Sequence, residues 1–257
     1  MYKYKLTLEY DGTNYSGWQV QKNARSIQGI LIKTAENFLE TPVGIQGAGR
    51  TDAGVHALGQ VAHLETAKQI DAERLRFGLN DNLPAGINIL HVQQANPRFH
   101  ARHHAKSRSY LYLIARRRTA LAKRYVWWIK DILDVKKMQR ALAHFAGFHD
   151  FASFADKKMD KDTSTQVNIE AVQLKEFNNI IAIRIVGSHF LWKMVRRIVG
   201  VTAEVGRGKL SVSDIEKMLN SYSDKPAKFT APPSGLFLES VLYEGDKLQE
   251  MKPPIWL

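Results

Sequence analysis

The sequence predicts an α+β protein built on a mainly antiparallel sheet flanked by helices. Alternating apolar residues indicate a half-buried strand over residues 2–9, and two further strands follow each other closely at 168–175 and 179–186. Apolar residues at helical spacing indicate helices over 27–39 and 190–204. Because the strands come in hairpin-like pairs rather than in strict alternation with helices, α+β is favoured over a parallel sheet.

Capping and turn residues delimit the predicted elements. Ser26 is suited to cap the first helix, and Asp134 is suited to cap a helix that begins after it. Ser213, with Glu216 three residues later, has the spacing of a capping box. Further strands are predicted over 57–66, 107–114 and 236–243, and loops over 11–14, 44–54, 80–84 and 96–97.

A strand followed by a helix opens both halves of the chain, which predicts two similar α/β subdomains. We place their boundary near residue 105, giving an N-terminal subdomain at 1–105 and a C-terminal one at 106–257. No flexible linker or low-complexity tract separates them.

Charge is the informative part of the composition. The 257 residues include 37 Lys and Arg against 25 Asp and Glu, a formal net charge of +12. A surplus of this size predicts attraction to polyanions, nucleic acid first among them. The chain has no cysteine, which excludes disulfides, thiolate zinc sites and cysteine nucleophiles. The start of the chain alternates rather than running apolar, so we expect a cytoplasmic protein without a signal peptide or a membrane span.

The loop Gly47–Gly54 is the segment most suited to chemistry. It lacks the glycine pattern of a dinucleotide fingerprint and the Gly-Lys-Ser/Thr of a P-loop, and instead holds Arg50 two residues before Asp52. The carboxylate can act as nucleophile or general base, and the arginine can bind phosphate or keep the acid ionised. A solvated turn is the alternative interpretation, because glycine and aspartate are common in turns.

The segment Gly49-Arg50-Thr51-Asp52-Ala53-Gly54-Val55-His56-Ala57 resembles the signature of the tRNA pseudouridine synthase A family. Other motifs of that family occur in the same order along nearly the whole chain. They are Glu9-Tyr10-Asp11-Gly12-Thr13, Gly17-Trp18-Gln19, Phe99-His100-Ala101-Arg102, Ser107-Arg108-Ser109-Tyr110, Phe148-His149-Asp150-Phe151, Phe190-Leu191-Trp192-Lys193-Met194-Val195-Arg196 and Ala231-Pro232-Pro233-Ser234-Gly235-Leu236.

The resemblance implies an isomerase that converts uridine to pseudouridine in the anticodon stem-loop of tRNA, at positions 38, 39 and 40. It implies the pseudouridine synthase fold, in which the sheet is continuous and a cleft lies between the two subdomains. It also implies a homodimer that binds tRNA by base flipping, with no cofactor and no metal. A non-catalytic RNA-binding protein on the same scaffold is the alternative.

The resemblance also implies roles for single residues. Asp52 is the catalytic carboxylate, and whether it attacks C6 or C1′ or abstracts a sugar proton stays open. Tyr110 lies against the flipped base and Arg196 pairs with the aspartate, although strand pattern alone also allows Tyr110 as a core aromatic. Arg50 fills the space of the extruded base, with Thr51, His56 and Arg108 as further RNA-contacting residues. Neighbouring Arg197 is interpreted as a phosphate contact or a solvated charge.

Two other groups of residues were candidates for chemistry. His100, His103 and His104 have helical i, i+3, i+4 spacing, but we expect no acidic residue nearby and basic residues surround them, so a metal site is disfavoured. No Gly-x-Ser-x-Gly segment supports a serine hydrolase. The basic residues at 116–118 and 123–124, close to Trp127-Trp128, fit either an RNA contact or a solvated loop with anchored tryptophans.

Overall fold

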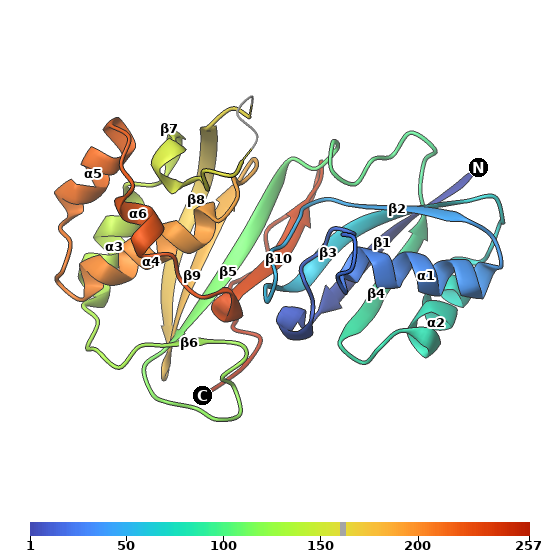
Figure 1. The fold of residues 1–257 in the computed structure, drawn as a ribbon, viewed down its shortest axis with the longest axis horizontal. Coiled ribbons are helices and arrows are strands. Elements are labelled where there is room, and N and C mark those ends of the chain that lie inside the picture. The colour runs from blue at the N-terminus through green and yellow to red at the C-terminus, as the bar shows by residue number, and fades with distance from the viewer. Residues whose placement is uncertain (160–162) are drawn as a thin grey trace. The chain divides into compact units, whose positions relative to one another are not determined.

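The chain forms two compact units in the computed structural model, which describes residues 1–159 and 163–257. The first unit comprises Met1–Lys106 with Phe237–Leu248, and the second comprises Ser107–Leu236 with Gln249–Leu257. Each unit combines mostly antiparallel strands with its own helices (Figure 1). The predicted α+β fold class is therefore confirmed.

The sheet of the first unit has the strand order β4-β1-β3-β10, with β2 also paired to β3. Strand β1 is antiparallel to both its neighbours, whereas β10 is parallel to β3. The strands are β1 (Tyr2–Tyr10), β2 (Val43–Gly47), β3 (His56–Thr66), β4 (Ile87–Gln94) and β10 (Leu236–Leu242).

Alternation along β1 places its apolar face in the core of this unit. Tyr4, Leu6 and Leu8 are fully buried, as the alternating pattern predicts. Helices α1 (Ile27–Leu39) and α2 (Ala72–Asn82) pack side by side against the sheet (Figure 1). The Ser26 side chain accepts a hydrogen bond from the Gly29 amide, which confirms the predicted cap of α1.

Two expectations for this unit are wrong in detail, and two of its elements were missed. Strand β2 occupies the start of the predicted 44–54 loop, because its residues pair with the far end of β3. The loop signal at 80–84 overlaps α2, where the Asn80 amide bonds the backbone of Ile89 in β4 instead of making a turn. Helix α2 and strand β4 themselves had not been predicted.

The sheet of the second unit has the strand order β5-β9-β8-β7, with antiparallel pairing throughout that path. The short strand β6 is parallel to β5. The predicted strand pair after residue 166 is confirmed, and Asn178, with φ 50°, makes the tight connection. The strands are β5 (Ser107–Ala115), β6 (Trp127–Trp128), β7 (Gly147–Asp150), β8 (Gln166–Phe177) and β9 (Ile180–Gly187).

The helices of the second unit pack together beside β7 and β8 (Figure 1). Asp134 caps α3 through the Lys137 amide, as predicted. The helices are α3 (Val135–Ala143), α4 (Met194–Gly206), α5 (Val212–Asn220) and α6 (Lys225–Lys228). Single 3-10 turns are η1 (Gly12–Asn14) in the first unit, and η2 (Ala152–Phe154) and η3 (Pro233–Gly235) in the second.

Two helix starts in this unit differ from the prediction. Helix α4 begins at Met194 rather than near residue 190, because Lys193 has φ 64° and cannot continue an α-helix. The capping box of α5 is formed by Ser211 and Asp214, two residues earlier than the predicted Ser213 and Glu216. Each member of the observed pair bonds the other's backbone amide, which fixes the first turn.

Helix length shows whether any described helix could span a membrane. Across 1–159 and 163–257 the longest helices have 13 residues, fewer than the roughly 20 that cross a bilayer. No helix in those ranges meets the length and hydropathy that a membrane span requires.

Candidate active site

A tight turn presents Asp52 in the loop between β2 and β3. The Val55 amide donates a hydrogen bond of 3.1 Å to the Asp52 carbonyl, so residues 52–55 form a β-turn. Gly54 at its third position has φ +75°, a value that side chains disfavour and that a type II turn requires there. The Asp52 side chain is half-buried and the Arg50 side chain is exposed.

Residues distant in sequence fix this loop from three directions. The Trp18 amide donates to the Thr51 carbonyl at 3.0 Å, and the Gln60 side-chain amide donates to the Gly49 carbonyl at 2.9 Å. The Tyr10 and Thr51 hydroxyls share a hydrogen bond of 2.7 Å, with Thr51 buried. The predicted site residue Thr51 therefore anchors the loop on which Asp52 is carried.

Two glycines let the segment after β1 approach the loop closely. A Cβ added to Gly12 would lie 2.0 Å from the Val55 carbonyl oxygen, and one added to Gly17 would lie 2.5 Å from that of Thr51. Gly17 also has φ +91°, which favours glycine. The structure thus explains motifs 9–13 and 17–19, because these segments pack directly against the Asp52 loop and support it.

His56 is buried at the start of β3 and lies next to the same supporting segment after β1. Its Nδ1 is 3.1 Å from the Gly12 amide nitrogen and 3.1 Å from Asp11 Oδ1. The Gly12 amide requires an unprotonated Nδ1 that accepts a hydrogen bond, whereas the Asp11 carboxylate requires a protonated Nδ1 that donates one, so only one of these is a hydrogen bond at a time. The imidazole also stacks on the Phe237 ring of β10, with centroids 4.8 Å apart. His56 is thus a component of the loop's support.

The predicted site residues of the second unit lie on β5 and α4. Tyr110 is buried on β5, and the Phe190 ring packs edge-on against it with centroids 5.0 Å apart. On the same strand, Arg108 Nη1 donates to the Ser188 carbonyl at 2.8 Å. Both contacts join β5 to the segment that precedes α4.

Arg196 is half-buried in the first turn of α4 and is held by the 231–235 motif. Its Nε donates to the Ala231 carbonyl at 2.7 Å, and the Ala231 amide donates back to the Arg196 carbonyl at 3.0 Å. The Tyr112 hydroxyl of β5 donates to the Pro232 carbonyl at 2.8 Å. The proline-rich motif therefore ties α4 to β5 and fixes the direction of the Arg196 side chain.

The expectation that Arg197 is a phosphate contact or a solvated charge is wrong. Arg197 is buried, donates to the Ala155 carbonyl and lies 3.6 Å from Asp156. Asp156 also pairs with Lys193 at 2.7 Å. Burial alone would raise the pKa of Asp156, but the Lys193 hydrogen bond and the nearby cations outweigh it and lower that pKa. Arg197 thus holds the start of α4 in place.

The structure therefore distributes the predicted site residues in two groups. Arg50, Thr51, Asp52 and His56 come together in and beside one loop of the first unit. Arg108, Tyr110 and Arg196 belong to the second unit, on β5 and α4. Gln60 had been missed; the signal for it was a polar residue at a buried position of the apolar strand 57–66.

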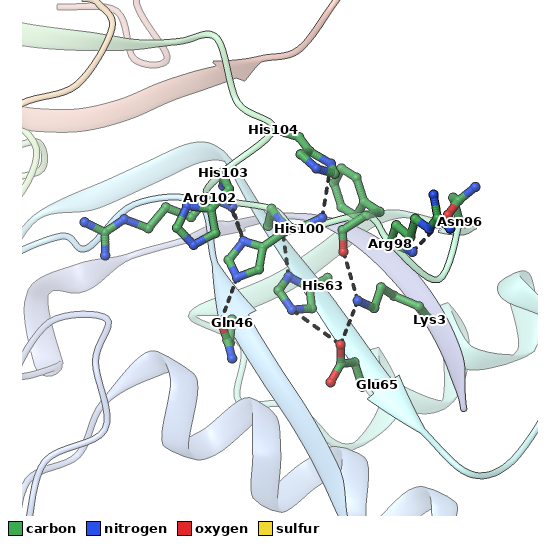
Figure 2. A network of polar contacts seen from close by, with 12 residues as sticks. Lys3, Gln46, His63, Glu65, Asn96, Arg98, His100, Arg102, His103 and His104 are labelled. Atoms are coloured by element: carbon green, nitrogen blue, oxygen red, sulfur yellow. Dashed lines mark hydrogen bonds and ion pairs between the residues drawn. The ribbon is translucent and has the colours of Figure 1, made fainter.

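The histidine cluster at 100–104 differs from its predicted form. Residues 101–103 form a turn rather than a helix. Glu65, distant in sequence, lies near the cluster in space, so the expectation of no nearby acidic residue is wrong (Figure 2). His63 Nδ1 accepts from the Ala101 amide at 3.1 Å, and its Nε2 is 3.9 Å from Glu65. Within the described ranges, no group of three acidic or histidine ligands has metal-binding geometry.

His63 should make the stability of the protein depend on pH. Burial, then the neighbouring His100 and Lys3, lowers the pKa of His63 from 6.5 to about 4. A neutral folded histidine contributes stability above pH 6.5, and that contribution is lost as the pH falls from 6.5 towards 4. We expect the free energy of unfolding to fall by up to about 1.4 kcal/mol per pH unit in this window.

Urea unfolding of the wild type and of His63→Asn at several pH values measures this effect. Asparagine keeps an acceptor for the Ala101 amide but does not titrate, so its slope between pH 6.5 and 4 should be shallower. Equal slopes for the two proteins would show that His63 is not the group responsible.

The tryptophans after the basic residues 116–118 differ from each other. Trp127 packs edge-on against Tyr112, with ring centroids 6.3 Å apart, whereas Trp128 is 41% exposed beneath the Arg118 guanidinium. Trp127 is thus half-buried against a core tyrosine, whereas Trp128 is available to solvent, and the proposed RNA contact stays a prediction.

Comparison with known proteins places the chain in a class. The family model described as tRNA pseudouridine synthase matches residues 7–104 and 141–244. The tRNA pseudouridine synthase A of Acetivibrio thermocellus is 41% identical over 241 residues, which cover 93% of this chain and 98% of that protein. The enzyme of the same name from Geotalea uraniireducens is 41% identical over 245 residues, covering 95% of this chain and all of that protein.

A third relative of that name, from Ruminiclostridium cellulolyticum, is 39% identical over 246 residues, covering 95% of this chain and 100% of its own. The chain therefore belongs to the tRNA pseudouridine synthase A family, a family of isomerases. Among solved structures, a chain of a Cbf5-Nop10-Gar1 complex has a TM-score of 0.35 at 10% identity, covering 77% of this chain and 54% of its own.

Proposed function

We propose that this protein converts uridine to pseudouridine in the anticodon stem-loop of tRNA, with Asp52 as the catalytic carboxylate. The observation that carries the proposal is the Asp52 loop itself. Hydrogen bonds with Trp18, Gln60 and Tyr10 fix it, within a segment matched by the family model. Such pre-organisation is what a reacting carboxylate requires.

The isomerisation defines what the site has to do. The glycosidic bond between C1′ and N1 of the uridine breaks, the base turns, and a new bond forms between C1′ and C5. The C5 proton leaves and N1 gains one, so no electrons enter or leave and the reaction consumes no redox partner. A carboxylate can carry such a reaction as nucleophile or as base, and both roles require Asp52 to be ionised.

The other predicted residues take roles that suit their chemistry. The exposed Arg50 guanidinium, next to Asp52 in the loop, fills the space of the extruded base, which costs a few kcal/mol to unstack. Tyr110 offers its ring to the flipped base, and Arg196 is the counter-charge of the aspartate. Thr51, His56 and Arg108 support the loop and the RNA contact.

The partner we propose is tRNA, bound by a homodimer in the cytoplasm. The net charge of +12 supports a polyanionic ligand. The relatives that match this chain over at least 93% of its length are named for a tRNA reaction. The two predicted subdomains, 1–105 and 106–257, would then both contribute residues to catalysis.

The test is a turnover assay with unmodified tRNA followed by mapping of the modified positions. Purified protein should form pseudouridine at positions 38, 39 and 40 without added metal or cofactor. The same positions should lack pseudouridine in cells without the protein. If the purified protein binds tRNA but forms no pseudouridine, the enzyme proposal fails and a purely RNA-binding function takes its place.

A further inference from the structure

A cavity of about 630 Å³ opens in the first unit, away from the Asp52 loop. It lies where β1, the end of β4, the segment 95–106 and the residues after β10 meet. Its lining combines aromatic, cationic and amide side chains. The lining residues are Lys5, Gln93, Gln94, Ala95, Asn96, Phe99, His103, His104, Lys106, Tyr243 and Glu244.

We propose that this cavity binds one unpaired nucleotide of the RNA substrate, with the base on the aromatic wall and the phosphate on the lysines. The proposal rests on the proposed function for the nature of the RNA. The volume lies within the range of about 300 to 1,000 Å³ that is usual for ligand pockets.

The aromatic wall consists of Phe99 and Tyr243, whose ring centroids are 5.5 Å apart. The Lys5 ammonium lies 4.2 Å from the Tyr243 centroid and 5.7 Å from that of Phe99. Aromatic faces bind bases by stacking with little regard to sequence. Lys5 lies over these faces in the free protein, and its flexible side chain would move to the adjoining phosphate when a base takes its place. A wall of this kind is suited to a nucleotide rather than to an apolar ligand.

The charge of the lining favours an anion. The lining has two ammonium groups, those of Lys5 and Lys106, and a single carboxylate, that of Glu244. His103 and His104, which also belong to the lining, are exposed. Lys106 pairs with Glu244 at 3.0 Å, but both side chains are largely exposed, so the pair is weak and a phosphate can replace the carboxylate. In the described parts of the chain, no carboxylate lies within ion-pair distance of Lys5.

The wall is held rigidly from behind. The Tyr243 hydroxyl donates to the Ala101 carbonyl at 2.7 Å, and Lys3 donates to the Phe99 carbonyl at 3.0 Å while pairing with Glu65 at 2.7 Å. Figure 2 shows Lys3, Glu65 and His63 beneath the turn that carries His100, His103 and His104. A pre-formed wall loses little conformational entropy on binding. The motif 99–102 contributes to this rigidity, because the carbonyls of Phe99 and Ala101 accept the two hydrogen bonds.

The cavity is separate from the place where the base reacts. Its rear wall is supported by His63, whereas the Asp52 loop leads into the same strand at His56. Seven residues of extended chain at about 3.3 Å each put these points on the order of 20 Å apart. The bound nucleotide would therefore be one that positions the RNA, not the uridine that is isomerised.

Two substitutions at Tyr243 test the stacking wall. Tyr243→Leu and Tyr243→Phe both remove the hydroxyl bonded to Ala101, but only leucine removes the aromatic face. In fluorescence anisotropy with unmodified tRNA, we expect Tyr243→Leu to weaken binding about fivefold or more, and Tyr243→Phe to stay within about twofold of the wild type. Equal affinity of the leucine and phenylalanine variants would overturn the proposal, provided that thermal melting shows both to be folded.

A charge-removal pair tests the phosphate contact. The double variant Lys5→Gln, Lys106→Gln should make the slope of log K against log salt shallower by about 0.7 for each phosphate lost. The matched control is Lys33→Gln, Lys68→Gln, which removes the same charge from exposed positions of the first unit outside the cavity. Equal slopes for the two double variants would overturn the proposal.

A free nucleotide has the same chemistry as a nucleotide of RNA, and one further arm separates them. Uridine 5′-monophosphate is titrated against the wild type and Tyr243→Leu by calorimetry. If the mononucleotide binds in a Tyr243-dependent way while tRNA affinity is unaffected by the variants, the cavity serves a free nucleotide and the RNA proposal is wrong. All these readouts measure binding, so a failure of the pseudouridylation proposal, seen as absent turnover, is distinguishable from a failure here.

Discussion

Asp52→Asn is expected to lower kcat/KM for pseudouridine formation by about 10³-fold or more, while tRNA affinity stays within a few-fold. Asparagine has the same shape but can act neither as nucleophile nor as base at the sugar or the pyrimidine. The hydrogen bonds described above that fix the loop use its backbone groups and the Thr51 hydroxyl, so the substitution leaves them in place. Single-turnover kinetics with saturating enzyme would separate the chemical step from binding.

The control for this substitution is Asp81→Asn, which makes the same chemical change on the exposed side of α2. It should leave both turnover and affinity unchanged. If the wild type is active and Asp52→Asn keeps activity within about tenfold of it, Asp52 is not the catalytic carboxylate. If this protein binds tRNA but does not modify it, the wild type, Asp52→Asn and Asp81→Asn would all be inactive.

Elements with a strong pattern could be predicted from the sequence alone. Strand β1 alternates over its whole length, and α1 and α3 begin at residues whose side chains cap them as expected. These features are local, since each depends on residues within a few positions of one another.

Helix α2 and strand β4 were missed for identifiable reasons. Only Leu75 and Leu79 of α2 are buried, so its apolar stripe is too thin to recognise. In β4 the pairing with β1 passes from His91 to Ile89 across an irregularity, which shifts the alternation between Ile89 and Val92. A bulge of this kind depends on the partner strand and leaves no clear period in its own sequence.

The Asp52 loop shows the same division between local and distant information. Its glycines and its aspartate indicate a turn, and only the resemblance to a family gives that turn a catalytic role. The residues that hold it, Tyr10, Trp18 and Gln60, are brought together by sheet pairing and by close approach at Gly12. Such contacts over tens of residues cannot be derived from spacing.

Gly12→Ala should lower kcat/KM by about 100-fold although Gly12 carries no reactive group. The added Cβ would lie 2.0 Å from the Val55 carbonyl oxygen and 2.6 Å from its carbonyl carbon. Backbone atoms cannot rotate away as a side chain can, so either the turn that carries Asp52 or the 3-10 turn η1 has to move. A displacement near 1 Å of a reacting group costs on the order of 10²-fold in rate.

Gly86→Ala is the matched control, because Gly86 contacts the same segment after β1: its carbonyl accepts a hydrogen bond from the Asp11 amide. A Cβ there would meet the Tyr15 hydroxyl at 3.5 Å, an ordinary contact, so turnover should be unchanged. Both variants are compared by circular dichroism before kinetics, at a temperature where each is folded. If folded Gly12→Ala turns over tRNA as fast as Gly86→Ala, then close support by the segment after β1 does not set the position of Asp52. If only Gly12→Ala is slow and its tRNA affinity is retained, the segment after β1 affects the chemical step alone, as expected if it positions the Asp52 carboxylate.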